Sequence, residues 1–331
     1  MQAFLRAQWN KNGLWAWICL PLSLLVCSYA GLKRKAYLWG LIKATRASAP
    51  VIVIGNLSVG GAGKTPLVAH IAQLLINQGY RPGIISRGYK GSASQWPQKV
   101  SASSNPLEVG DEPVMLAAQT GCPVMAGPNR PDSAQRLIDQ RGCDVLLSDD
   151  GFQHLKLARD IDILVFDSAY GDGLGNHWCL PSGPLREPAC ARKAADMQVF
   201  QGGSAKPVGP GIYTMTLLPG KIYALGDKRI ANIELLQQHP LHAVAGIARP
   251  ARFFDSARGA GLTIIEHPFD DHHAYSPVDL EFSDEHHVIT TEKDAIKLAG
   301  LHTPKTIWVL PVQAIMNSRF DADLLDKLRS L

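Results

Sequence analysis

The stretch Val51-Ile-Val-Ile-Gly55-Asn-Leu-Ser-Val-Gly60-Gly-Ala-Gly-Lys64-Thr65-Pro66 decides the fold of this chain. Its four leading β-branched residues predict a buried strand, and the apolar residues after Pro66 recur at spacings of three and four, which predicts a helix. A strand, a glycine-rich turn and a helix that begins at Lys-Thr together form a phosphate-binding loop. The usual motif would place its first glycine at position 58, where this chain has Ser58.

The chemistry of phosphate binding explains the residue types in this loop. Its glycines let the backbone wrap around a phosphate and turn its N–H groups inward, and the helix N-terminus adds partial positive charge. The lysine can reach the β- and γ-phosphates, and the threonine hydroxyl can ligate Mg²⁺. We therefore expect nucleotide binding by Ser58, Val59, Gly60, Gly61, Ala62, Gly63, Lys64 and Thr65.

Apolar and amphipathic segments alternate along the rest of the chain, which has 331 residues and 46% hydrophobic residues. This β/α alternation predicts a P-loop NTPase-like, largely parallel sheet with helices on both faces. Residues 213–226 alternate around Pro219-Gly220 and predict a β-hairpin, followed by a smaller C-terminal α/β lobe. The predicted parts are a membrane-associated helical segment (1–47), a P-loop core (48–212), the hairpin linker (213–226) and the smaller lobe (227–331). Six cysteines without C-x-x-C pairs or zinc spacing predict reduced thiols.

The N-terminal part is basic and contains a long uncharged stretch. The first 107 residues hold 12 Lys and Arg and no acidic residue, and residues 12–32 carry no charge. Tryptophans and the basic run Lys33-Arg34-Lys35 flank this stretch, which suits a bilayer interface. A cleaved signal peptide would export the nucleotide site, and a spanning helix needs about 20 apolar residues. We expect attachment by a helix lying in one leaflet, with a buried core helix as the alternative.

Carboxylates and histidines stand at three informative positions. Asp149 and Asp150 follow an apolar strand, and phosphate-loop proteins hold Mg²⁺ at such a strand end. Adjacent aspartates project differently, so we expect only one of them near the metal. Asp111 stands at a predicted helix start, where it is either a helix cap or a functional carboxylate. His272 and His273 follow two aspartates, which suits proton transfer better than metal binding.

Seven motifs occur in a fixed order along the chain: Gly55-Asn-Leu-Ser-Val-Gly-Gly-Ala-Gly-Lys-Thr-Pro66, Ser86-Arg-Gly-Tyr89, Gly110-Asp-Glu-Pro113, Asp149-Asp-Gly-Phe-Gln-His154, Pro184-Leu-Arg-Glu-Pro188, Asp271-His-His273 and Thr291-Glu-Lys-Asp-Ala-Ile-Lys-Leu298. Together they resemble the tetraacyldisaccharide 4′-kinases, the lipid A kinases of Gram-negative bacteria. The resemblance covers nearly the whole chain, and Ser58 belongs to this family's own version of the loop.

The resemblance implies a reaction and a location. The reaction is ATP-dependent phosphorylation of the 4′-hydroxyl of a tetraacylated glucosamine disaccharide 1-phosphate, with Mg²⁺ as cofactor, to give the bis-phosphorylated lipid A precursor, lipid IVA. The implied place is the bacterial inner membrane, with the catalytic part facing the cytoplasm and in contact with the cytoplasmic leaflet. Neither a nucleic acid nor an obligate protein partner is expected.

The resemblance also implies roles for individual residues. Asp111 is implied as the base that takes the hydroxyl proton, with His272 as its partner and Lys64 as the catalytic lysine. Metal contacts are implied for Thr65, Asp149 or Asp150, Gln153 and Glu187, and acceptor contacts for Arg87, Tyr89, Arg130 and His154. The alternatives from other classes are a membrane-anchored P-loop ATPase or nucleotide switch without a lipid acceptor, and a soluble small-sugar kinase.

Overall fold

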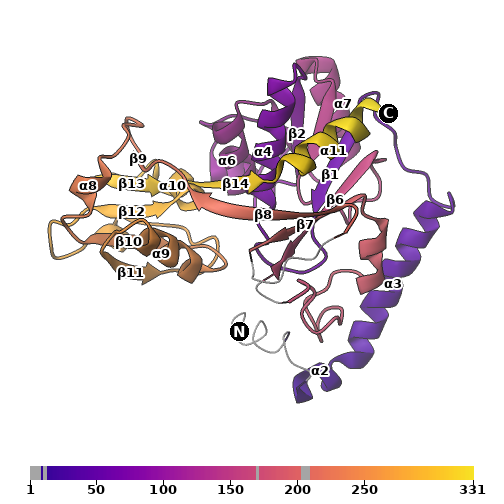
Figure 1. Cartoon of the computed structure of the whole chain (residues 1–331), viewed down its shortest axis with the longest axis horizontal. Coiled ribbons are helices and arrows are strands. Elements are labelled where there is room, and N and C mark those ends of the chain that lie inside the picture. The colour runs from indigo at the N-terminus through magenta and orange to yellow at the C-terminus, as the bar shows by residue number, and fades with distance from the viewer. Residues whose placement is uncertain (1–8, 10–12, 169–170, 203–208) are drawn as a thin grey trace.

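The computed structural model describes residues 9, 13–168, 171–202 and 209–331, and these form two sheets joined by two strands (Figure 1). The larger sheet has nine strands. In spatial order they are β14 (Val312–Met316), β8 (Ile212–Pro219), β7 (Met197–Gln201), β6 (Ile161–Asp167), β1 (Val51–Gly55), β5 (Val145–Ser148), β2 (Pro82–Ser86), β4 (Val124–Ala126) and β3 (Gln98–Val100). All but the two outermost strands run parallel, as the sequence predicts.

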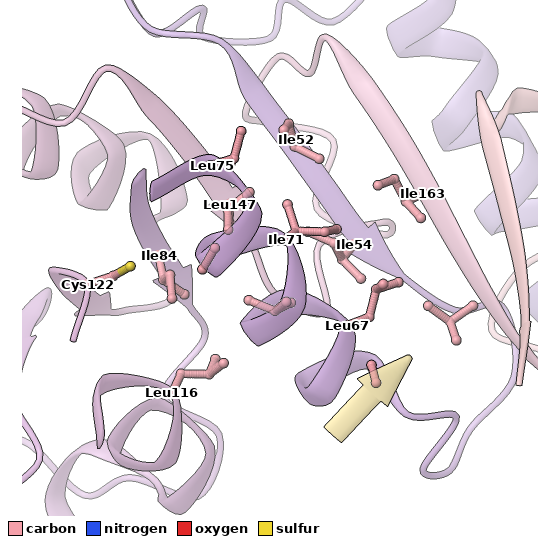
Figure 2. Close-up of a cluster of buried hydrophobic side chains, with 14 of the residues drawn as sticks. Ile52, Ile54, Leu67, Ile71, Leu75, Ile84, Leu116, Cys122, Leu147 and Ile163 are labelled. Atoms are coloured by element: carbon pink, nitrogen blue, oxygen red, sulfur yellow. The ribbon is translucent and has the colours of Figure 1, made fainter. Parts of the chain in front are cut away.

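Strand β1 is buried on both faces, because its alternate side chains enter two different cores. Ile52 and Ile54 point into the first core, where α4 (Lys64–Asn77), α6 (Asp111–Thr120) and α11 (Ser318–Arg329) cover the sheet. Figure 2 shows Leu67, Ile71 and Leu75 of α4 in this core. Val51 and Val53 enter the second core, which α7 (Arg130–Arg141) and the loops after β5 and β6 cover. This pattern explains the unbroken apolar run.

The smaller sheet has the order β11 (Ile264–Pro268), β10 (Leu241–Ala245), β12 (Val288–Thr291), β13 (Ile307–Leu310) and β9 (Tyr223–Ala224). Its helices are α8 (Ile233–Leu236), α9 (Pro250–Gly259) and α10 (Glu292–Leu298), with the 3-10 turn η3 (Pro277–Leu280). Phe253 and Phe254 of α9 pack with Trp308 of β13 in a separate core. The smaller lobe therefore has a hydrophobic interior of its own.

The predicted β-hairpin over residues 213–226 was wrong. Strand β8 pairs with β7 and with β14 of the large sheet, whereas β9 pairs with β13 of the small sheet. Pro219-Gly220 therefore marks the passage between two sheets rather than a tight turn, and local alternation does not distinguish the two. The chain then returns through β14 and α11, so two antiparallel strands link the sheets (Figure 1).

The N-terminal segment forms α2 (Leu14–Ile18) and α3 (Leu20–Leu38), which run along one side of the large sheet (Figure 1). Leu14, Trp17 and Leu25 are each more than 60% exposed. No helix among the described residues is long and apolar enough to cross a membrane. Cys27 of α3 is joined to Cys179 by a disulfide, so the expectation of six reduced thiols was wrong for this pair. The two short segments α5 (Pro106–Val109) and η2 (Ala189–Ala194) complete the described helices and turns.

Candidate active site

The phosphate-binding loop joins β1 to α4 at the carboxyl edge of the large sheet, as predicted. Gly60 and Gly63 have φ values of +121° and +86°, which favour glycine. A Cβ atom at Gly60 or Gly61 would meet nothing within 4 Å, so the loop is open on that side. A pocket lies over it, lined by residues 58–62 and by Asp167 and Arg249.

Asn56 braces the loop from within and was not predicted as a site residue. Its amide donates to the carbonyl of Ser58 at 2.6 Å, and its Oδ1 accepts from Lys64 Nζ at 3.2 Å. Asn56 is fully buried. The motif Gly-Asn-Leu-Ser contained this signal, because a buried amide beside a glycine-rich turn can satisfy the turn's own backbone groups.

The two aspartates after β5 have different surroundings, as the sequence predicts for neighbours that project differently. Asp150 is 3.3 Å from Lys64 Nζ and 2.9 Å from Arg186 Nη1. Burial acts to raise its pKa, but the two cations together hold the pKa below its ordinary value. Its φ is +45°, a left-handed conformation that is uncommon outside glycine.

Asp149 is 2% exposed, and its Oδ1 has no hydrogen-bond partner among the described residues. Burial raises its pKa, and the carboxylates of Glu112 and Asp150 raise it further. The charges of Lys64 and Arg130 lower this pKa by less than burial and the two carboxylates raise it, so the buried carboxylate is only partly compensated. Mg²⁺ fits this place, because it binds through one or two carboxylates together with substrate phosphates.

Other predicted metal contacts have partners in the protein. Gln153 donates its amide to the carbonyl of Asn56 at 3.0 Å, beneath the loop. Glu187 is 4% exposed and accepts two hydrogen bonds from Arg34, at 2.6 and 3.1 Å. Among the residues that the structure describes, no group of three or more His, Cys, Asp or Glu is arranged to hold a metal. A metal here would depend on the nucleotide as well as on Asp149 and Thr65.

The structure brings Asp111 and His272 together across 161 residues of sequence. His272 Nδ1 lies 2.8 Å from Asp111 Oδ2, and the backbone N–H of Glu112 donates to the other oxygen at 2.9 Å. Asp111 begins α6 of the large lobe, whereas His272 follows β11 of the small lobe. The backbone N–H of His272 donates to the carbonyl of Gly246 at 3.1 Å, which holds the loop in place.

Lys293 of α10 is the third member of this group and was not predicted. Its Nζ is 3.3 Å from His272 Nε2 and 4.0 Å from Asp111 Oδ2. An ammonium only donates, so Nε2 accepts from it and Nδ1–H donates to Asp111. Burial acts to raise the pKa of Asp111, but the hydrogen bond from His272 and the charge of Lys293 lower it below its ordinary value. The signal was present in the motif Thr-Glu-Lys-Asp.

The predicted acceptor contacts lie at the same edge of the sheet but differ in exposure. Arg87 is exposed, and Tyr89 is 53% exposed with its ring edge-on to His272, the ring centroids 5.7 Å apart. Burial and then the charges of Arg130 and Arg87 lower the pKa of His154 to about 4, so this imidazole is neutral near pH 7.

Arg130 is 2% exposed and points into the protein. It donates to Ser148 Oγ and, at 3.0 Å, to the carbonyl of Asp150. These contacts assign it to holding the end of β5, and they leave little of its side chain for an acceptor.

Comparison with known proteins identifies the family to which the chain belongs. The family model described as Tetraacyldisaccharide-1-P 4′-kinase matches residues 15–329. The chain is 48% identical to the tetraacyldisaccharide 4′-kinase of Alkalilimnicola ehrlichii over 294 residues, 89% of this chain and 87% of the relative. It is 42% identical to that of Nitrosococcus oceani over 321 residues, 97% of this chain and 93% of the relative.

A solved structure is also similar. The "apo" form of LpxK from Aquifex aeolicus, crystallised in complex with ATP, superimposes with a TM-score of 0.81 at 28% identity. The match covers 95% of this chain and 99% of that one.

Proposed function

The chain belongs to the tetraacyldisaccharide-1-P 4′-kinase family, and from this premise we propose that it transfers the γ-phosphate of ATP to the 4′-hydroxyl of a tetraacylated glucosamine disaccharide 1-phosphate. The single observation that supports this most directly is the Asp111–His272 contact between the two lobes. A P-loop ATPase without an acceptor needs no proton acceptor for a sugar hydroxyl, and this contact supplies one.

The residues have separate tasks in the proposed reaction. Asp111 takes the proton of the 4′-hydroxyl while the sugar oxygen bonds to the γ-phosphorus and the bond to the β–γ bridging oxygen breaks, so ADP leaves. Neutral His272 orients the carboxylate, and Lys293 keeps it charged. Lys64 supplies positive charge to the phosphates, with the backbone N–H groups of the loop. Thr65 and Asp149 would hold Mg²⁺, which would neutralise negative charge on the phosphates.

The proposal includes attachment to a lipid surface through α2 and α3. The exposed apolar side chains of these helices and the turn after them support it: Leu14, Trp17, Ile18, Leu22, Leu24, Leu25, Leu32, Leu38, Trp39 and Leu41. Helices of this kind lie in the interface plane. We place the protein at the cytoplasmic leaflet of the inner membrane, where ATP is available. Flotation with phospholipid vesicles should follow the intact chain and be lost when Trp17, Leu22 and Leu25 are changed together to Ser.

The test of the reaction compares Asp111→Ala, His272→Ala and the double variant. General bases contribute about 10²–10⁴-fold, so each single change should lower kcat by an amount in that range. Because the two groups act as a unit, the double variant should be little worse than the poorer single one. Strictly additive losses would instead assign them independent roles.

Two further measurements separate the alternatives. If Asp111 only caps α6, its replacement should lower Tm, at a cost of about 1 kcal/mol, with near-normal kcat. ATP consumption by the unaltered protein should require the disaccharide lipid, and equal consumption without lipid would favour an ATPase or a nucleotide switch.

A further inference from the structure

Helix α3 places one buried cation against the loops of the active site. Arg34 lies between Lys33 and Lys35, which are both exposed, but only 8% of Arg34 is exposed. Its Nε donates to Glu187 Oε2 at 2.6 Å, and its Nη2 donates to Glu187 Oε1 at 3.1 Å. This two-point contact fixes the plane of the guanidinium as well as its position.

The same guanidinium also holds the loop that follows β5. Nη2 donates to the carbonyl of Phe152 at 3.0 Å, and the guanidinium carbon stands 4.1 Å from the centre of the Phe152 ring. Phe152 is fully buried and comes two residues after Asp150. Arg34 therefore contacts two loops that are more than 30 residues apart in sequence.

These two loops meet again at the nucleotide side. Arg186, the neighbour of Glu187, donates to Asp150 at 2.9 Å, and Asp150 contacts Lys64 of the phosphate loop at 3.3 Å. The backbone N–H of Arg186 donates to the carbonyl of Leu57 at 2.8 Å. The residues that Arg34 fixes are thus the direct neighbours of those that hold Asp150 and the phosphate loop.

We propose that Arg34 is a positioning residue for phosphoryl transfer. Its contacts with Glu187 and Phe152 attach the loops 149–154 and 184–188 to α3, and this holds both loops against the phosphate-binding loop. The N-terminal helix then has a task inside the active site besides attachment to lipid. Glu187 belongs to this contact rather than to the metal. The inference rests on the proposed kinase function.

The experiment uses the full chain in detergent with Arg34→Met, Glu187→Met and the double variant. The matched control is Arg46→Met. Arg46 belongs to the same N-terminal segment as Arg34 and pairs with Asp160, but the Arg46 side chain is 71% exposed. Each single change leaves a buried charge unpaired and should lower Tm, whereas the double variant should recover much of the loss. The readouts are Tm, kcat, the KM for ATP and the Mg²⁺ concentration that gives half-maximal rate.

We expect kcat to fall at least tenfold in both single variants and to stay low in the double variant after Tm recovers, with Arg46→Met unchanged. Recovery of kcat together with Tm would overturn the inference, since the pair would then be structural only. A lower Mg²⁺ requirement in Arg34→Met would also overturn it, because a freed Glu187 would then be binding the metal. Absence of lipid phosphorylation by the unaltered protein would refute the proposed function instead, and nucleotide hydrolysis by the same variants would still test Arg34.

Discussion

Adding a single methyl group at Gly55 should push apart two parts of the nucleotide site: strand β1 and the loop that follows β5. A Cβ atom at this position, the last residue of β1, would lie 2.6 Å from Phe152 Cβ and 3.0 Å from the backbone N of Phe152. Carbon atoms at ordinary separation are about 3.5–4.0 Å apart, so the two segments must move apart by roughly 1 Å. Gly55→Ala therefore displaces the loop that carries Asp149 and Asp150 from the strand that leads into the phosphate loop.

The surroundings of Phe152 prevent an easy escape. Its side chain is fully buried, and its carbonyl accepts from both Arg34 and Arg159. Overpacking of this kind costs about 1–3 kcal/mol, and each kcal/mol lowers Tm by about 2–4 °C. A displacement near 1 Å at a catalytic centre can cost about 10²-fold in rate. We expect kcat to fall by that order while the protein stays folded at 25 °C.

The assay follows phosphate transfer from ATP to the disaccharide lipid, together with a thermal melt. Gly226→Ala is the matched control, because a Cβ there would meet nothing within 4 Å. Its Tm and kcat should equal those of the unaltered protein. If Gly55→Ala also keeps both values, the contact between β1 and the Phe152 loop does not set the geometry of the site, and the reasoning fails.

Three other changes test the remaining parts of the site. Lys64→Ala removes charge from the transferring phosphate and should lower kcat by about 10²-fold or more, and a folded variant with near-normal turnover would contradict this. Replacing Asp149 and Asp150 together by Asn should abolish Mg²⁺-dependent turnover, and retained Mg²⁺ dependence at the normal rate would place the ion elsewhere. Lys293→Met removes a charge that lowers the pKa of Asp111, so this pKa should rise. The acid limb of the kcat/KM profile, where activity falls as Asp111 becomes protonated, should therefore move to higher pH. Lys293→Arg should move the limb less, and an unmoved limb in Lys293→Met would mean that Asp111 is not the base.

Local pattern predicted most of the large sheet, because each element there is specified by adjacent residues. The strand at 51–54, the helix from Asp111 to Thr120 and the strand from Ile161 to Asp167 all appear as expected. The hairpin over 213–226 failed because alternation reveals a strand but not its partner. Besides β7, the partner of β8 is β14, nearly 100 residues later, and no residue near β8 indicates that pairing.

The site could be predicted where a motif or the family resemblance carries the chemistry. Lys64 stands out in sequence because its residue type suits phosphate binding, whereas the roles of Asp111 and His272 and their pairing were implied by the resemblance. Arg34 does not stand out, since it looks like one of three basic residues flanking an apolar helix. Its neighbours Lys33 and Lys35 are exposed as that pattern suggests. Only the rotation of α3 against the core determines which of the three is buried beside Glu187.

Two residues of the candidate site have a strained backbone that contacts with distant segments hold in place. Asp150 and His272 both have left-handed φ values, +45° and +65°, and neither is glycine. Asp and His tolerate this region better than most residues, yet such conformations cost about 1–3 kcal/mol each and persist only where the surroundings over-determine them. At Asp150 the determining contacts are Lys64 and Arg186, and at His272 they are the Gly246 carbonyl and Asp111. Each strained residue thus joins two chain segments that are distant in sequence. Because the left-handed backbone is strained, we expect it to relax when one of these contacts is removed. The Asp150 carboxylate or the His272 imidazole would then move away from the transferring phosphate.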